Sequence, residues 1–269
     1  MSLVNRNGRP APAGLTLVEL LIAMTIVVTV VGTLAGLGQA VHMGAAFSEQ
    51  TGIQTQHARV TLERIARHVR RSHTNNRFPG FLVIPDMVSG HELPETLVVW
   101  SPEDEGGNPI EPADPEGLPR FNELVVISPA PTSSNGLWEL WELRFPKDDV
   151  EKVPEIGDWD AWREEIDLLK QEPESEVVLT DQVQTVAVAE TGGQPRAAVR
   201  FDGLLRPSDD ELENYRDKWE DAPWVQGLYG PNTGLRQAWL RIELQLGRDA
   251  PTSFFGSATR YYSVRREER

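Results

Sequence analysis

The sequence contains no cysteine among its 269 residues. This absence excludes a disulfide framework, a thiol nucleophile and a zinc–thiolate site. Any folded region of the chain must therefore be held together by its hydrophobic core. The chain is long enough to bury such a core, and its eight tryptophans can contribute to it.

Basic residues are few relative to acidic ones. The chain has 26 Lys and Arg against 41 Asp and Glu, for a formal net charge of −15. A strongly acidic surface argues against nucleic acid as a partner. It also argues against a domain that binds anionic lipid headgroups through its surface.

The motifs of the common enzyme families are missing as well. We find no G-x-S-x-G elbow, H-E-x-x-H pair, P-loop or dinucleotide-binding fingerprint. His57 and His68 fall on one predicted helix but are eleven residues apart, too far to share a metal ion. We therefore predict that the chain is not an enzyme and holds no cofactor or metal ion.

Charge is almost absent from one long segment near the N-terminus. Glu19 is the only charged residue among the twenty-four from Leu15 to Gly38. As a helix, this segment is long enough to cross a hydrocarbon core of about 30 Å. Arg6 and Arg9 precede it, and a basic flank stays on the cytoplasmic side. The pattern predicts a transmembrane helix at 15–38 with the rest of the chain exported.

Glu19 is the unusual feature of this segment. An ionisable group inside a membrane span is costly and is by default a functional hypothesis. Cleavage of the chain between Gly14 and Leu15 would give Leu15 a free amino group. Residues four apart lie on the same side of a helix, so this amine would lie one turn from the carboxylate and offset its cost.

The run Gly14-Leu15-Thr16-Leu17-Val18-Glu19-Leu20-Leu21 closely resembles the prepilin cleavage and methylation motif of type IV pilins and type II secretion pseudopilins. The resemblance implies cleavage after Gly14 by a prepilin peptidase and N-methylation of Leu15. It also implies that Glu19 pairs with an N-terminal amine in an assembled filament. Major pilins commonly carry a proline about where Gly36 lies, and its absence argues against a major subunit.

Three other interpretations of the segment remain open. It could be a secretory signal peptide cleaved near Gly38-Gln39-Ala40, although such apolar regions are usually about 7–15 residues long. It could be an uncleaved anchor, or the buried core helix of a soluble protein. Within the segment, Gly32 and Gly36 form a G-x-x-x-G pair, which lets helices approach closely in a membrane. Alternatively, the two glycines reflect flexibility of the helix or chance, and not helix packing.

The helix is expected to continue as an amphipathic segment over 39–73. Ala58, Leu62, Ile65 and Val69 recur at helical spacing and should pack on a globular domain. The opposite side is basic and is either solvated or docks an acidic neighbour. Its members are Arg59, Arg64, Arg67, Arg70 and Arg71.

Short apolar runs separated by turns predict a sheet in residues 74–269. Two helices are expected, at 158–171 and from Pro207 onward, where Ser208 and Glu211 form an S-x-x-E capping box. The strands are expected at 81–84, 96–100, 123–128, 137–145, 176–180, 183–189, 197–201, 235–246 and 258–264.

Residues 101–120 hold five prolines and six acids, which predicts a long exposed loop. The acids could hold calcium, but they lack the spacing of an EF-hand loop, and solvation is the preferred interpretation. They are Glu103, Asp104, Glu105, Glu111, Asp114 and Glu116.

The expected fold is therefore α+β, pilin-like, with a long N-terminal helix packed on an antiparallel sheet. The expected division is a leader at 1–14, a span at 15–38, an amphipathic helix at 39–73 and a periplasmic domain at 74–269. The strand at 235–246 and the closing Arg260-Tyr261-Tyr262-Ser263-Val264 resemble the minor pseudopilin J family of type II secretion. The predicted strand at 183–189 and the Trp-containing irregular segment at 219–224 also resemble this family.

This resemblance implies a structural subunit near the tip of a secretion pseudopilus, waiting in the inner membrane. Its implied partners are the prepilin peptidase, other pseudopilin or pilin subunits and the membrane, with no nucleic acid. A minor type IV pilin of the W type is the close alternative. An exported binding domain with an ordinary anchor or signal peptide is the alternative from a different class.

Overall fold

The computed structural model describes residues 16–104, 107–132, 136–187, 193–215, 218, 221, 233–247 and 251–265. The chain divides into two compact units, Met1–Gly52 and Ile53–Arg269, and each is described by itself. The predicted leader at 1–14 lies outside the described residues.

Helix α1 (Leu17–Arg71) is continuous over 55 residues, as the sequence predicts. It begins with a capping box that the sequence analysis did not identify. The Glu19 amide donates to Thr16 Oγ1 at 3.3 Å, and the Thr16 amide donates to Glu19 Oε2 at 2.9 Å. These reciprocal bonds satisfy two of the amide groups that a helix start leaves unpaired.

In the first unit, α1 is exposed from Leu17 to Gln50 and carries an apolar stretch of 18 or more residues. By length and composition, α1 is a candidate membrane-spanning helix near the N-terminus. It is the one such helix in the described part of the chain. A buried core helix would be covered by other elements of the molecule, and none of the apolar stretch is buried.

The second unit is built on an eight-stranded antiparallel sheet, so the α+β prediction is confirmed. Its strand order is β1-β2-β3-β4-β5-β9-β10, and β8 also pairs with β9. A separate hairpin joins β6 to β7. The strands are β1 (Phe81–Val88), β2 (His91–Trp100), β3 (Leu124–Pro131), β4 (Trp138–Arg144), β5 (Ser175–Val183), β6 (Thr185–Ala187), β7 (Pro195–Ala197), β8 (Val199–Arg206), β9 (Thr233–Leu246) and β10 (Thr252–Arg265).

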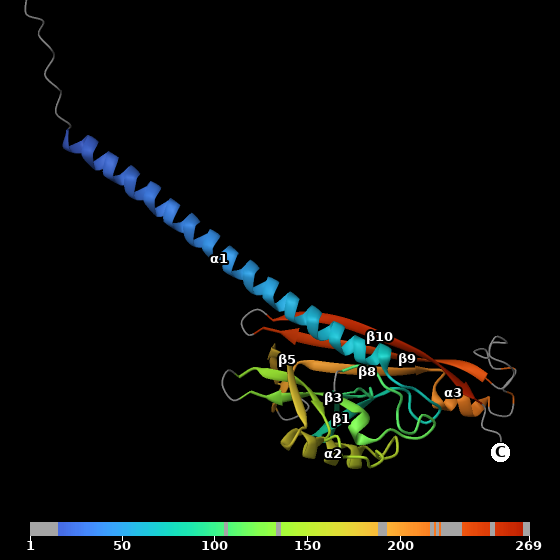
Figure 1. Ribbon diagram of the computed structural model, residues 1–269. Coiled ribbons are helices and arrows are strands. Elements are labelled where there is room, and N and C mark those ends of the chain that lie inside the picture. Colours follow the sequence, from blue (N-terminus) through green and yellow to red (C-terminus); the bar gives the residue numbers. More distant parts are fainter. Residues whose placement is uncertain are drawn as a thin grey trace, which may run out of the picture. The chain divides into compact units, whose positions relative to one another are not determined.

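Both faces of this sheet are covered, which divides the core into two layers. Successive side chains of β2 alternate between them, with Leu97 and Val99 in one and Val98 and Trp100 in the other. The Ile53–Arg71 part of α1 covers the first face. Helix α2 (Trp159–Gln171) covers the opposite face with Trp162, Ile166 and Leu169 (Figure 1).

The apolar stripe of α1 packs against the sheet as predicted. Ala58, Ile65 and Val69 are buried in the first layer, and Leu62 packs against it. At Gly256 on β10, an added Cβ atom would lie 3.0 Å from Leu62 Cδ2. Glycine at this position therefore lets the helix and the strand approach each other closely.

We expect Gly256→Val to lower the free energy of unfolding of the second unit by about 1–3 kcal/mol, because the new methyl groups meet Leu62. Urea denaturation of the full chain in detergent measures the loss. The matched control is the same substitution in a Leu62→Ala background, where the space is already open and the added loss should be smaller. An equal loss in both backgrounds would contradict the contact.

Several predicted element boundaries are wrong. Strand β10 begins at Thr252, six residues before the prediction, because it pairs with β9 in an unbroken register of fourteen residues. Strand β1 continues past Ile84 through a shift in register. The predicted strand at 183–189 divides, since Val183 ends β5 and β6 follows from Thr185. Helix α3 (Asp209–Asn214) starts with the predicted Ser208–Glu211 capping box.

The loop at 101–120 is irregular, as predicted, but it is not simply solvated. Glu123, buried at the end of the short 3₁₀ helix η1 (Phe121–Glu123), accepts from the backbone amides of Ala113 and Arg120 and from Trp100 Nε1. Glu103 is likewise largely buried. Glu105, one of the six acids, lies outside the described residues, and Glu103 belongs to the site described next.

Candidate functional site

The residues predicted from the N-terminal motif lie only partly within the described chain. Gly14 and Leu15, the predicted cleavage and methylation positions, lie outside the described residues. Glu19 is exposed, and its carboxylate accepts from both the amide and the hydroxyl of Thr16 at 2.9 Å. Gly32 and Gly36 are exposed, with no atom within 4 Å of an added Cβ. Their roles in assembly and helix packing stay predictions.

The capping box gives Glu19 a second role beside the predicted one. The sequence signal for it was present, because Thr16-Leu17-Val18-Glu19 has the T-x-x-E spacing. Any substitution of Glu19 therefore changes both a charge and a helix cap, and an experiment on this residue must separate the two.

The second unit carries a charged groove of about 640 Å³ beside the last turns of α1. The sequence analysis did not predict it. Its residues come from α1, from β4 and β5, and from the loop after β2. They are Arg59, Val60, Glu63, Arg64, Arg67, His68, Arg71, Glu103, Gly107, Glu142, Arg144, Ser175 and Val177.

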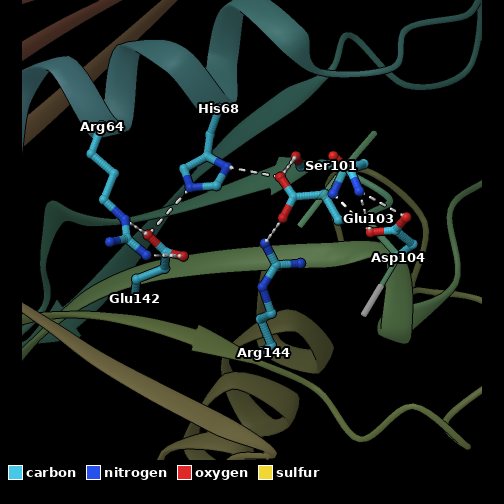
Figure 2. Close-up of polar contacts among 8 residues, drawn as sticks. Arg64, His68, Ser101, Glu103, Asp104, Glu142 and Arg144 are labelled. Atoms are coloured by element: carbon cyan, nitrogen blue, oxygen red, sulfur yellow. Dashed lines mark hydrogen bonds and ion pairs between the residues drawn. The ribbon is translucent and has the colours of Figure 1, made fainter. Parts of the chain in front are cut away.

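An ion-pair network forms the floor of this groove (Figure 2). Arg64 holds Glu142 through two bonds, from Nε to Oε2 at 2.6 Å and from Nη2 to Oε1 at 3.0 Å. His68 lies between two carboxylates, with Nε2 3.2 Å from Glu142 Oε2 and Nδ1 3.8 Å from Glu103 Oε1. Arg144 Nη2 contacts Glu103 Oε2 at 2.5 Å. The network joins α1 to β4 and to the loop at 101–120.

Glu142 is the central carboxylate of the network and is buried. Burial opposes its ionised form, but hydrogen bonds from His68 and Arg64 and the charges of these groups outweigh that effect and lower its pKa to about 2. The carboxylate is therefore ionised at neutral pH, and Glu142 holds α1 on the sheet as a charged group.

The rim of the groove differs from its floor, because three of its arginines are unpaired in the described part of the chain. Across the described residues, no hydrogen bond or ion pair involves the side chain of Arg59, Arg67 or Arg71, and all three residues are exposed. Glu63, on the same side of the helix, pairs instead with Arg70 at 3.2 Å. The predicted basic side of α1 thus has three parts: Arg64 pairs with Glu142, Arg70 pairs with Glu63, and the other three arginines remain open.

The open arginines of this groove suit the binding of carboxylates. Guanidinium groups bind carboxylates in paired geometry, as Arg64 already does with Glu142. Within the described ranges, no three His, Asp or Glu side chains are placed to hold a metal ion. The calcium alternative for the acidic loop therefore gains no support from the residues described.

A second hollow of about 420 Å³ lies on the other side of β4, and charged side chains that pair with one another line it. Arg196 bonds both Asp86 and Glu95, with 2.5 Å between Arg196 Nη2 and Glu95 Oε2. Burial raises the pKa of Glu95 and lowers that of Lys170. Because Arg196 pairs with both acids, this cluster is a structural element that ties β1 and β2 to β7.

We compared the chain with known proteins, and no family model, curated protein or solved structure matches it.

Proposed function

We propose that the chain is a structural, pilin-like subunit, a minor pseudopilin of a type II secretion system. In this proposal the leader is removed after Gly14, Leu15 is methylated, and α1 anchors the subunit in the inner membrane. The second unit then lies in the periplasm. Assembly transfers the apolar part of α1 from lipid into the helical core of a filament, near its tip.

One observation carries the proposal. An apolar helix with no burial inside its own unit begins at the prepilin-like motif, and its single charged residue over Leu15–Gly38 is Glu19. A helix of this kind needs a partner or a membrane to cover it. An unpaired carboxylate in a helix bundle is costly, so Glu19 favours only the packing register in which an amine reaches it.

The second unit is compatible with the proposed role. The Ile53–Arg71 part of α1 supplies part of its core, so the helix and the sheet form one folded body in that unit. This supports a structural role in an assembly rather than a freely tethered binding domain.

Glu19→Gln tests the proposal more sharply than Glu19→Ala, since glutamine retains the capping box and removes the charge. We expect both variants to be processed normally and to be incorporated into filaments at least about tenfold less than the parent, because an uncharged side chain cannot pair with the amine. Immunoblotting of sheared filaments against total membrane protein measures incorporation.

Thr16→Ala is the matched control, because it weakens the cap and leaves the carboxylate in place. It should be incorporated close to the parent level. Normal incorporation of Glu19→Gln together with loss for Thr16→Ala would mean that Glu19 acts only through the helix cap, and the assembly role would be wrong.

A further inference from the structure

The open arginines of the groove form a regular row on α1. Arg59, Glu63, Arg67 and Arg71 are four residues apart, so each lies about 6 Å along the axis from the next and the row turns gradually around the helix. All four line the groove. The row therefore presents a fixed order of charges, positive, negative, positive, positive, along about 18 Å.

The length of the row sets the shape of its occupant. Arg59 and Arg71 both line the groove and are separated by about 18 Å along the helix axis. An occupant that contacts the whole row must therefore be elongated and lie along α1.

An extended strand also matches the spacing of the row. Alternate side chains of a strand point the same way and are about 6.6 Å apart, close to the 6 Å step on the helix. Positions 1, 3, 5 and 7 of such a strand can therefore face Arg71, Arg67, Glu63 and Arg59. Glu63 and Arg70 form an exposed pair, and a base at position 5 would take the place of Arg70 beside Glu63. Charge complementarity requires an acid at 1, 3 and 7 and a base at 5.

The other charges of the groove favour a peptide over a lipid or nucleic acid surface. Glu63 lies within the row and would repel the continuous charge of a phosphate backbone or an anionic lipid surface, whereas a peptide can place a base opposite it. The net charge of −15 repels an extended anionic surface at longer range. Val60 and Val177 supply apolar contact area beside the arginines.

We propose that the groove beside α1 binds an extended acidic peptide segment with the pattern acid-x-acid-x-base-x-acid. This inference goes beyond the assembly role, since it concerns the second unit, and its test needs neither leader cleavage nor a filament.

The test uses the purified full chain in neutral detergent and the capped, fluorescently labelled heptapeptide Glu-Ser-Glu-Ser-Lys-Ser-Glu. Fluorescence anisotropy at low ionic strength should give a dissociation constant below about 1 mM, weakening as salt is added. The isomer Lys-Ser-Glu-Ser-Glu-Ser-Glu has the same composition but places like charges together in either orientation. It should bind at least about tenfold more weakly.

Substitutions of Arg67 test how the peptide is aligned with the row of charges on α1. Arg67→Glu should prefer the peptide Glu-Ser-Lys-Ser-Lys-Ser-Glu, whereas the parent prefers Glu-Ser-Glu-Ser-Lys-Ser-Glu. Arg77→Gln removes an exposed arginine outside the groove and is the matched control for Arg67→Gln. It should leave the affinity unchanged, while Arg67→Gln weakens it by about threefold to tenfold.

Equal affinity of the parent for the two peptide isomers would overturn the proposal, and this comparison needs no variant to fold. So would a failure of Arg67→Glu to change the preference. Binding to vesicles of anionic lipid that depends on Arg59, Arg67 and Arg71, without binding to the peptide, would assign the row to a membrane surface instead. None of these outcomes bears on processing at Gly14.

Discussion

Replacing Glu142 by alanine is expected to lower the free energy of unfolding of the second unit by about 2–4 kcal/mol. The substitution leaves the buried His68 without an acceptor for Nε2 and breaks both bonds from Arg64. Arg64 is half exposed and can regain water, which keeps the loss below that of a fully buried pair. Urea denaturation of the full chain in detergent, followed by tryptophan fluorescence, measures the change.

The same carboxylate predicts an acid transition. Its pKa in the folded chain is lowered to about 2 from the usual 4.5, so the unfolded chain binds the proton first as pH falls. The stability that Glu142 contributes is therefore fully present above about pH 4.5 and is lost progressively towards pH 2. Glu142→Gln should remove this part of the pH dependence of stability.

Glu176→Gln is the matched control, because Glu176 is an exposed acid on the neighbouring strand β5. It should retain the pH dependence of the parent between about pH 4.5 and 2. If Glu142→Gln lost stability over this range as steeply as the parent, the ion pair would not be what fixes α1 to β4.

A second large effect is expected at the other end of the chain. In the proposed function, Gly14→Val should block removal of the leader completely, because the peptidase implied by the motif cleaves after a small residue. The protein should keep its whole leader, and intact-mass measurement distinguishes this from cleavage at Leu15. If the segment were a signal peptide cleaved after Ala40, or an uncleaved anchor, the Gly14→Val substitution would leave processing unchanged.

Gly8→Val provides the control within the leader, since it makes the same substitution six residues before the junction. It should be processed as the parent is. Normal maturation of Gly14→Val would contradict prepilin processing, whatever the behaviour of the control.

Local patterns predicted the local elements of the fold. Helix α1 follows from an apolar run that continues into a 3-and-4 spacing without proline, and β9 follows from strict alternation between Leu240 and Leu246. The cap of α3 follows from Ser208 and Glu211. These elements depend on residues that are close in sequence, which periodicity can detect.

The two-layered core could have been predicted, but it was not. The unbroken apolar runs Leu97–Trp100 and Leu124–Ile127 are typical of strands that are covered on both faces. All eight residues are buried in the structure. The sequence predicts helix α2, which covers the second face of the sheet, but it does not predict on which face α2 lies.

The groove could not have been predicted from local patterns. Arg64 and Glu142 are 78 residues apart, and their contact depends on the register of β4 in the sheet and on how α1 lies across it. Glu103 is one of six acids in its loop, and its contacts with His68 and Arg144 depend on how the loop lies beside α1 and β4. Long-range pairs of this kind leave no periodic signal in a single sequence.

The most direct test of the proposed subunit role is the intact mass and terminal sequence of the protein isolated from its native membrane. The proposal predicts an N-terminus at Leu15 carrying one added methyl group. A terminus at Val41 would show removal of a signal peptide, and a terminus at Met1 or Ser2 would show an unprocessed anchor. Either result would contradict assembly as a pilin-like subunit.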